Sequence, residues 1–366
     1  MIGGIQLGVL AACLVLFVPM LMAGWHLSRN KMLFFSGALF ITLAVCVHLT
    51  PYFPSVSEFA SSFSSFVVFD HRDSCINLVN QIAWDVKPRN DLIDKNDNSS
   101  LENYEKNWDW VNSGKVNACE FQKLGKSDAA DLLNGSWVVV AGDSQARLVI
   151  VSLLSFVLEK ERMDSIRGDL FKRHSDYNIA LDEIGLKMDF IWAPYEKNLT
   201  DLVVKFKAKR KYPDVLVMGS GLWHMLHYTN ATDYGVSLRV LKSSVESLLP
   251  FSPELGTNGP VTGSVSIRSP HLFWIGTPVL INGMLNTEEK REKMSDEMWH
   301  AYDRALGESK LLRQTGGPLV LLDIQSLTWN CGAWCTVDGM HYDGVVYEAA
   351  VHIMLNALLI ESHQVL

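Results

Sequence analysis

Five short apolar runs of strand length, separated by helical patterns, constrain the fold of this chain more than any other feature. The runs lie at 136–142, 187–193, 213–219, 271–276 and 318–323. Between and after them the apolar spacing is that of helices, at 145–160, 199–211, 233–248, 289–306 and 343–362. Strands that alternate with helices indicate a parallel sheet with right-handed crossovers. The continuous apolar character of strands such as "PDVLVMG" predicts an α/β fold with helices on both faces of the sheet.

Two longer apolar runs precede this alternation, at 5–25 and 32–53. Each is long enough to cross a bilayer as a helix, which takes about 20 apolar residues. The link between them holds Arg29 and Lys31, the only charged residues in 1–53. Because cytosolic loops are enriched in basic residues, we expect a two-helix transmembrane hairpin with both ends outside the cell or in a lumen. A cleaved signal peptide is the alternative for the first run, although the basic segment that usually opens one is missing.

The sequence therefore predicts three segments: a transmembrane hairpin at 1–53, a serine-rich stalk and loop-rich cap at 54–134, and an α/β catalytic domain at 135–366. Tryptophans are spread through the cap and follow the third strand, and they are candidates for stacking on sugar rings: Trp84, Trp108, Trp110 and Trp223. Other tryptophans fall within predicted strands, which favours a place in the core: Trp137, Trp192 and Trp274.

The charge of the chain argues against a nucleic-acid partner. It contains 40 acidic and 32 basic residues, with a formal net charge of −8 and no basic stripe. Four Asn-x-Ser/Thr sequons are candidate glycosylation sites and weakly support a lumenal location: Asn98, Asn134, Asn198 and Asn230.

Four cysteines of the large domain are candidates for two disulfides in an oxidising lumen: Cys75, Cys119, Cys331 and Cys335. Cys331 and Cys335 are the expected local pair because the loop between them is short. A zinc site is the alternative. However, no Cys-x-x-Cys spacing or histidine cluster lies near them, so we expect no bound metal.

Ser144 lies where a predicted strand passes directly into a predicted helix, in "VVVAGDSQARLV". Ligands of open parallel sheets bind at the carboxyl ends of the strands, so this hydroxyl faces a candidate site. The free N–H groups and the dipole of a helix start can stabilise a developing anion. The alternative is a helix N-cap, a position that serine often fills. The segment is not a Gly-x-Ser-x-Gly elbow, because Ala146 replaces the second glycine.

Asp338 and His341 lie after the last predicted strand and directly before the last helix, in "CTVDGMHYDG". A tight turn of this size brings a carboxylate close to an imidazole, which fixes the tautomer of the ring and raises its basicity. A capping aspartate and an unrelated surface histidine are the alternative. Because Ser144 follows the first strand of the same sheet, we expect the three side chains to meet at one sheet edge.

These motifs resemble those of a known family. "GDSQAR" is similar to the first block of SGNH-type esterases, and "DGMH" to their final Asp-x-x-His block. The Ser-x-x-Arg spacing to Arg147 and "PDVLVMGSGLWHM" resemble the PC-esterase group, which contains plant trichome-birefringence-like proteins and animal sialate O-acetyltransferases. The anchor and the modest length resemble its plant altered-xyloglucan type. The resemblance covers roughly residues 136–366.

The resemblance implies an SGNH-like, flavodoxin-like domain with Ser144 as nucleophile, His341 as general base and Asp338 as its orienting carboxylate. Ser144 would attack an acetyl group, and a sugar hydroxyl or water would then attack the acetyl-serine. Oxyanion or substrate contacts are expected near Gly142, although Asp143 more naturally holds the turn. The remaining candidates are Arg147, either for a substrate carboxylate or for a structural contact, and Ser220, Gly221 and His224. Ser220, Gly221 and His224 follow the third predicted strand, where other members of the family have an asparagine.

The expected activity is membrane-anchored O-acetylation of cell-wall polysaccharides, such as xyloglucan or xylan, in the Golgi lumen. An acetylesterase with the same triad and a non-catalytic glycan-binding scaffold are the alternatives. The resemblance implies no bound cofactor, with acetyl-CoA or an acetylated intermediate as co-substrate. The implied partners are the lipid bilayer, a polysaccharide acceptor, and an acetyl-donor transporter or other acetyltransferases.

Overall fold

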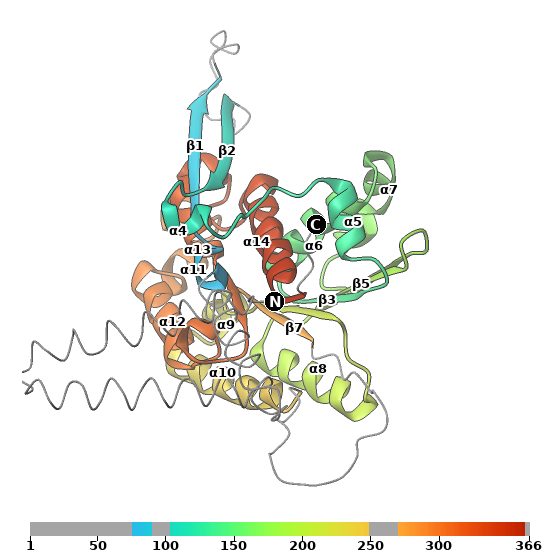
Figure 1. Ribbon diagram of the computed structural model, residues 1–366. Coiled ribbons are helices and arrows are strands. Elements are labelled where there is room, and N and C mark those ends of the chain that lie inside the picture. The colour runs from blue at the N-terminus through green and yellow to red at the C-terminus, as the bar shows by residue number, and fades with distance from the viewer. Residues whose placement is uncertain (1–74, 90–102, 249–269, 363–366) are drawn as a thin grey trace, which may run out of the picture. The chain divides into compact units, whose positions relative to one another are not determined.

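A six-stranded sheet forms the centre of the computed structural model, with the strand order β4-β5-β3-β6-β7-β8 (Figure 1). Five of its strands are parallel: β3 (Trp137–Gly142), β5 (Leu186–Trp192), β6 (Val215–Met218), β7 (His271–Ile275) and β8 (Val320–Leu322). Numbered along the chain, these five have the order 2-1-3-4-5 that is typical of flavodoxin-like folds. This confirms the predicted α/β class and the positions of all five predicted strands.

The structure describes residues 75–89, 103–248 and 270–362, all of which belong to one compact unit spanning Arg72–Leu366. The predicted transmembrane hairpin and Asn98 lie outside the described residues.

Each parallel strand faces two separate hydrophobic cores. In β3, Val138 and Val140 pack into one core, whereas Val139 and Ala141 pack into the other. Side chains of a strand alternate between the two faces of its sheet, so an unbroken apolar run is buried on both. The sequence "WVVVAG" therefore fixes a central strand.

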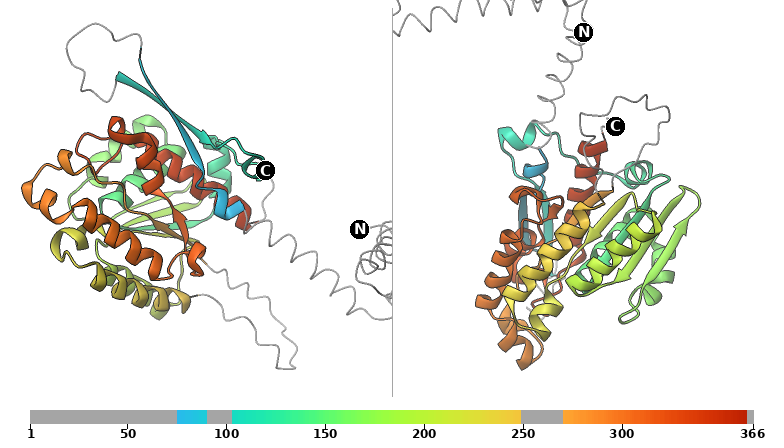
Figure 2. Two further views of the ribbon diagram at one scale, coloured as in Figure 1. Left: turned by 90° about the vertical axis from the view of Figure 1, so that its left-hand side faces the viewer. Right: turned by 90° about the horizontal axis from the view of Figure 1, so that it is seen from below.

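Helices cover both faces, as predicted. One face carries α5 (Lys126–Leu132), α6 (Ser144–Val157), α7 (Lys160–Leu170), α13 (Ile324–Cys331) and α14 (Gly344–Ser362). The other carries α8 (Glu196–Lys209), α9 (Leu222–His227), α10 (Ala231–Glu246) and α12 (Asp296–Glu308). Seen from below, α8 and α10 lie side by side across the sheet (Figure 2). Short 3₁₀ turns complete this part of the chain: η4 (Asn282–Met284), η5 (Arg313–Thr315) and η6 (Gly332–Cys335).

The helix predicted at 289–306 is two helices. α11 (Glu288–Lys293) ends before Met294, and α12 starts two residues later. The Ser295 hydroxyl accepts a hydrogen bond from the Met298 amide at 3.3 Å, which caps the second helix. An N-cap serine requires an extended backbone, so the helical pattern is interrupted at this residue.

The segment expected to be loop-rich contains regular elements. A hairpin of β1 (Ile82–Pro88) and β2 (Tyr104–Trp110) is followed by α4 (Gly114–Asn117) and α5. The bases of the hairpin strands share a hydrophobic core with the sheet, where Trp108 is 3% exposed. Because Trp108 and Trp110 are buried, their side chains stabilise the fold and are not free to stack on sugars. Trp84 is partly buried against the same core.

The sixth strand of the sheet is β4 (Tyr177–Leu181), which the sequence did not predict. It pairs antiparallel with β5 at the edge of the sheet. Its side chains alternate between exposed and partly buried positions, so it lacks the continuous apolar run that marked the other strands.

Helix α14 is, among the described residues, the one helix long and apolar enough to cross a membrane. However, 72% of its most apolar stretch is buried inside the protein, because it packs against α6 and α13. It is therefore the core helix of the domain.

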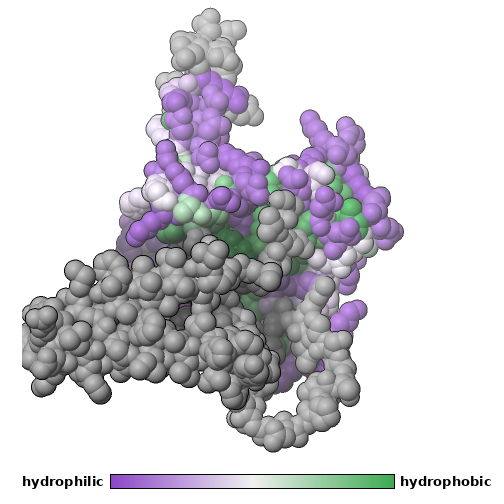
Figure 3. All heavy atoms as spheres, in the orientation of Figure 1, coloured by the Kyte–Doolittle hydropathy of each residue, from purple (hydrophilic) through white to green (hydrophobic). Residues whose placement is uncertain are grey.

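Hydrophilic residues cover the hairpin and the region of α5 and α7 on the face drawn in Figure 3, and hydrophobic residues are visible between them.

Candidate active site

Ser144 is the first residue of α6, directly after β3. The N-cap is Asp143, whose carboxylate accepts a hydrogen bond from the Gln145 amide at 2.9 Å. Asp143 therefore holds the turn, as predicted, and leaves the Ser144 hydroxyl free for another partner. Gly142 is required by packing, because a Cβ there would lie 2.3 Å from the carbonyl oxygen of Gly219 at the end of β6.

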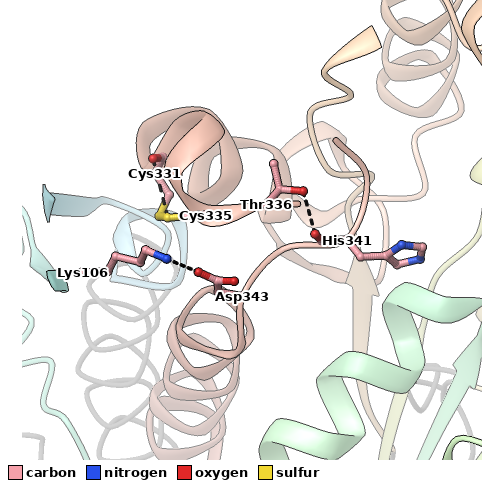
Figure 4. The surroundings of a disulfide bond; sticks show 6 residues. All are labelled: Lys106, Cys331, Cys335, Thr336, His341 and Asp343. Atoms are coloured by element: carbon pink, nitrogen blue, oxygen red, sulfur yellow. Dashed lines mark hydrogen bonds and ion pairs between the residues drawn. A yellow bond between two sulfur atoms is a disulfide. The ribbon is translucent and has the colours of Figure 1, made fainter. Parts of the chain in front are cut away.

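The segment 335–343 is a tight turn held from both ends. At its start, a disulfide joins Cys331 to Cys335, as predicted (Figure 4). Within it, the Thr336 hydroxyl donates to the carbonyl of His341 at 2.7 Å and accepts from the amide of Gly339 at 3.0 Å. At its end, Asp343 forms an ion pair with Lys106 of the hairpin. The hairpin and the disulfide thus fix the turn from which the His341 ring projects away from the disulfide.

A continuous chain of hydrogen bonds joins Asp338, His341 and Ser144. The Asp338 carboxylate lies 2.7 Å from Nδ1 of His341, and Nε2 of the same ring lies 2.8 Å from Oγ of Ser144. The two motifs are 197 residues apart in the sequence and meet at the carboxyl edge of the sheet, as predicted. This is the order of carboxylate, imidazole and hydroxyl that activates a serine nucleophile in acyl transfer.

The environment of Asp338 keeps it ionised. Partial burial acts to raise its pKa, but the His341 ring and the amides of His341 and Met340 all donate to the carboxylate and outweigh burial. The pKa of Asp338 therefore lies well below its usual range. A carboxylate that stays charged favours a proton on Nδ1 of His341, which leaves Nε2 able to accept the proton of Ser144.

Gln145 and Tyr347 connect the two halves of the site, and sequence reasoning missed both. The Gln145 amide donates to the carbonyl of Met340 at 3.0 Å, and its carbonyl accepts from the Tyr347 hydroxyl at 2.6 Å. The buried Gln145 side chain thus ties the start of α6 to the histidine turn and to α14. The sequence does carry a signal for Gln145, because it is a polar residue directly after Ser144 in an otherwise apolar helix.

The loop after β6, which is the neighbour of β3 in the sheet, holds two of the predicted oxyanion residues. Ser220 and Gly221 follow β6, whose end packs against Gly142. The Ser220 carbonyl accepts a hydrogen bond from Tyr234, which fixes this loop. Gly221 caps α9 with φ of 132°, a conformation that other residues rarely adopt. The Ser220 side chain is buried and does not line the cavity at Ser144.

The structure does not bring His224 to the nucleophile. Its ring is buried, with Nδ1 2.7 Å from the Tyr302 hydroxyl and Nε2 3.2 Å from the Asp233 carboxylate. Both nitrogens are therefore engaged in holding α9 against α12 and α10. The expectation of an oxyanion or substrate contact from this side chain does not fit this geometry.

Two buried carboxyl groups, those of Asp143 and Glu196, lie close enough to interact. Burial raises the pKa of Asp143 to about 6 and that of Glu196, the first residue of α8, to about 7. The two groups also repel each other when charged. Glu196 is therefore expected to be protonated below about pH 7.

A cavity of about 410 Å³ opens beside Ser144 and His341. Arg147, predicted to bind a carboxylate or to hold the structure, contributes to its wall, as does Trp223. Trp192 also lines it, which differs from the expected core position, because this residue ends β5 at the sheet edge. Trp274, by contrast, is fully buried as predicted, and Trp137 is partly buried, with its indole N–H bonded to Asp189.

The second disulfide joins Cys75 to Cys119.

Three sequon asparagines are exposed: Asn134, Asn198 and Asn230. Asn230 also caps α10, where its side chain accepts from the Asp233 amide at 3.1 Å. Within the described ranges, no group of three or more His, Cys, Asp or Glu residues could hold a metal ion.

Comparison with known proteins finds one close relative among curated sequences. The chain is 70% identical over 369 residues to "Protein ALTERED XYLOGLUCAN 9" of Arabidopsis thaliana, with all of both chains covered. No protein-family model matches. Among solved structures, a catalytic mutant of Axe2, an acetylxylan esterase from Geobacillus stearothermophilus, is 12% identical, covering 65% of this chain and 96% of its own, with a TM-score of 0.34. The structure of TesA is likewise 12% identical, covering 61% and 97%, with a TM-score of 0.33.

Proposed function

Because this chain belongs to the PC-esterase family of plant trichome-birefringence-like proteins, together with ALTERED XYLOGLUCAN 9, we propose that it is an enzyme that modifies cell-wall polysaccharides by acetylation. The observation that carries the proposal is the hydrogen-bonded series Asp338–His341–Ser144 at the mouth of a cavity. More specifically, we propose an O-acetyltransferase that works through an acetyl-serine intermediate.

In the first half-reaction, His341 removes the proton of the Ser144 hydroxyl as its oxygen attacks the acetyl carbonyl of the donor. The negative charge that develops on the carbonyl oxygen is stabilised by the amide of Ser144, at the start of α6, and by the amide of Gly221. Collapse of this intermediate breaks the bond to the leaving group, which takes the proton from His341. The products are acetyl-Ser144 and the free leaving group.

In the second half-reaction, His341 takes the proton of a sugar hydroxyl, and the sugar oxygen attacks acetyl-Ser144. Breakdown of the second tetrahedral intermediate releases the O-acetylated glycan, and the serine oxygen recovers its proton from His341. Throughout, Asp338 stabilises the positive charge on the imidazole ring. No step needs a metal ion or a redox cofactor; the acetyl donor is a co-substrate, either acetyl-CoA or an acetylated intermediate.

An acetylesterase is the second candidate, and one observation favours it. The side chains of His341 and Asp338 are 36% and 34% exposed, so water reaches the triad in this state. Transfer to a sugar requires that the acceptor displace this water. Binding of the polysaccharide over the open cavity is therefore the step that separates transfer from hydrolysis.

We place the catalytic domain in the Golgi lumen, anchored to the bilayer by the apolar segments of 1–53. The two disulfides and the exposed sequon asparagines fit an oxidising, glycosylating compartment. The partners we propose are the polysaccharide acceptor and the source of the acetyl donor, either a transporter or another acetyltransferase. Protease protection of tagged protein in sealed Golgi vesicles tests this orientation.

The activity is tested by incubating the purified full-length protein with an acetyl donor and xyloglucan or xylan oligosaccharides, followed by mass spectrometry of the sugars. Acetylated oligosaccharide supports the transferase, whereas free acetate without acetylated sugar supports the esterase. Ser144→Ala must abolish either activity. If this variant restores polysaccharide acetylation in mutant cells as well as the wild type does, the protein is a non-catalytic scaffold.

A further inference from the structure

The wall of the cavity beside Ser144 is positively charged. Arg147, Arg173 and Lys290 all line it, and no aspartate or glutamate does so among the described residues. The complete chain has a formal net charge of −8, so the charge of the cavity wall is opposite in sign to that of the chain as a whole. A cavity lined by one sign of charge attracts ligands of the opposite sign.

Three parts of the fold supply these cations. Arg147 is on α6, one turn after Ser144, Arg173 follows α7, and Lys290 is on α11. In the part of the chain that the structure describes, none of the three forms an ion pair with a carboxylate. Their charges are therefore available to a ligand.

Arg147 is the most informative of the three because it is buried. Only 8% of the residue is exposed, and its guanidinium lies 4.9 Å from the centre of the Phe190 ring and 5.1 Å from that of Trp192. One hydrogen bond, from Nη2 to the Ser175 carbonyl at 3.3 Å, is long, and Nε has no partner among the described groups. Buried charges are normally paired, so the Arg147 guanidinium lacks the anionic partner that a buried cation usually has.

A platform of aromatic rings lies beside the cations. The His174 ring stacks on Trp192 with centroids 4.9 Å apart, and Trp223 meets both rings edge-on. Flat rings of this kind pack against planar or pyranose groups. The cavity thus offers apolar faces for the body of a ligand and three cations for its charged part.

We propose that this cavity binds an anionic group of a substrate, a phosphate or a carboxylate, between Arg147, Arg173 and Lys290. The inference rests on the proposed function, because it supplies the substrate class for the Ser144 site. Guanidinium groups bind phosphate and carboxylate oxygens in pairs, and an ammonium group adds a third donor. Two sources carry this chemistry: the phosphates of an acyl donor, or the uronic-acid carboxylate of an acidic glycan acceptor. A neutral glycan has no such group, so with a neutral acceptor the anion belongs to the donor.

Equilibrium binding tests this without any chemical step. Isothermal titration calorimetry of the full-length protein in detergent uses two matched pairs of probes that lack acetyl groups. One pair is 4′-phosphopantetheine and pantetheine, and the other is a glucuronic-acid-substituted xylo-oligosaccharide and its unsubstituted counterpart. The wild-type protein is expected to prefer the charged member of one pair by at least tenfold. The pair in which this occurs identifies the source of the anion.

The variants are the double substitution Arg173→Ala with Lys290→Ala, its conservative form Arg173→Lys with Lys290→Arg, and Lys205→Ala as a control. Lys205 is exposed on α8 and does not line the cavity. Each charge-assisted contact is worth roughly tenfold in affinity, so the double alanine variant should lose about 10- to 100-fold of the preference. The conservative and control variants should retain it.

Equal binding of charged and neutral probes by the wild-type protein, in both pairs, would overturn the inference. An unchanged preference in a folded double alanine variant would do the same. Because no acetyl group is involved, failure of Ser144 to become acetylated would refute the proposed function and leave anion binding intact. Conversely, an active enzyme with no anion preference would refute this inference alone.

Discussion

Asp338→Asn separates the role of the triad carboxylate from its role in the turn. Asparagine keeps an oxygen in place of Oδ1, which accepts from the amides of Met340 at 2.9 Å and His341 at 2.7 Å, so the turn should remain folded. In place of Oδ2, however, an amide nitrogen now faces Nδ1 of His341. It can only donate, so the imidazole must carry its proton on Nε2, where it cannot accept the proton of Ser144.

The size of the effect follows from this change of tautomer. A proton on the wrong nitrogen of a triad histidine costs about 10⁴-fold in turnover, which corresponds to about 5 kcal/mol of transition-state stabilisation. Release of the coloured phenolate from a chromogenic aryl acetate measures kcat and kcat/KM, and thermal unfolding confirms that the variant is folded. The matched control is Asp201→Asn, which removes an exposed carboxylate on α8 that does not line the cavity at Ser144. It should change turnover less than tenfold. A folded Asp338→Asn protein with turnover within tenfold of wild type would refute the proposed role of this carboxylate.

Three further predictions follow from packing, burial and covalent linkage. Gly142→Ala places a methyl group 2.3 Å from the Gly219 backbone oxygen and should destabilise the protein by more than about 3 kcal/mol, whereas Gly168→Ala, with no atom within 4 Å, should be neutral or stabilising in chemical denaturation. Burial raises the pKa of Glu196 from 4.5 to about 7, so the folded state holds a proton that the unfolded state releases. Stability should therefore fall as pH rises from 4.5 to 7, by roughly 3 kcal/mol from this group, and Glu196→Gln should flatten that part of the stability curve; an unchanged slope would contradict the assigned pKa. Replacing Cys331 and Cys335 with serine opens a short loop and should lower the free energy of unfolding by about 2 kcal/mol. We expect a lower unfolding temperature and reduced esterase activity. A variant as stable and active as wild type would show that the disulfide does not hold the histidine turn.

The features that sequence predicted well are local or periodic. Continuous apolar runs marked the five parallel strands, and Ser144 and the Asp338–His341 turn were found because each lies where a strand or turn passes into a helix. The carboxyl ends of parallel strands share one edge, so the meeting of these residues followed from the fold class.

The features that sequence missed depend on contacts between distant segments. β2 alternates charged residues with tryptophan in "YEKNWDW", and its burial depends on α14, which lies far along the chain. His224 looked available because it follows a strand, but Tyr302 and Asp233 occupy its ring. Arg173 and Lys290 lie on elements without any strand-end signal, and only the folded chain brings them beside Ser144.

The most direct test is mass spectrometry of the full-length protein, quenched in acid after brief exposure to an acetyl donor. We predict an added acetyl group on the peptide that contains Ser144, and its absence in Ser144→Ala. A His341→Ala variant should form it far more slowly, because the hydroxyl then has no base within reach. Acetyl transfer at the wild-type rate with no label on Ser144, or with the label on another residue, would contradict the account.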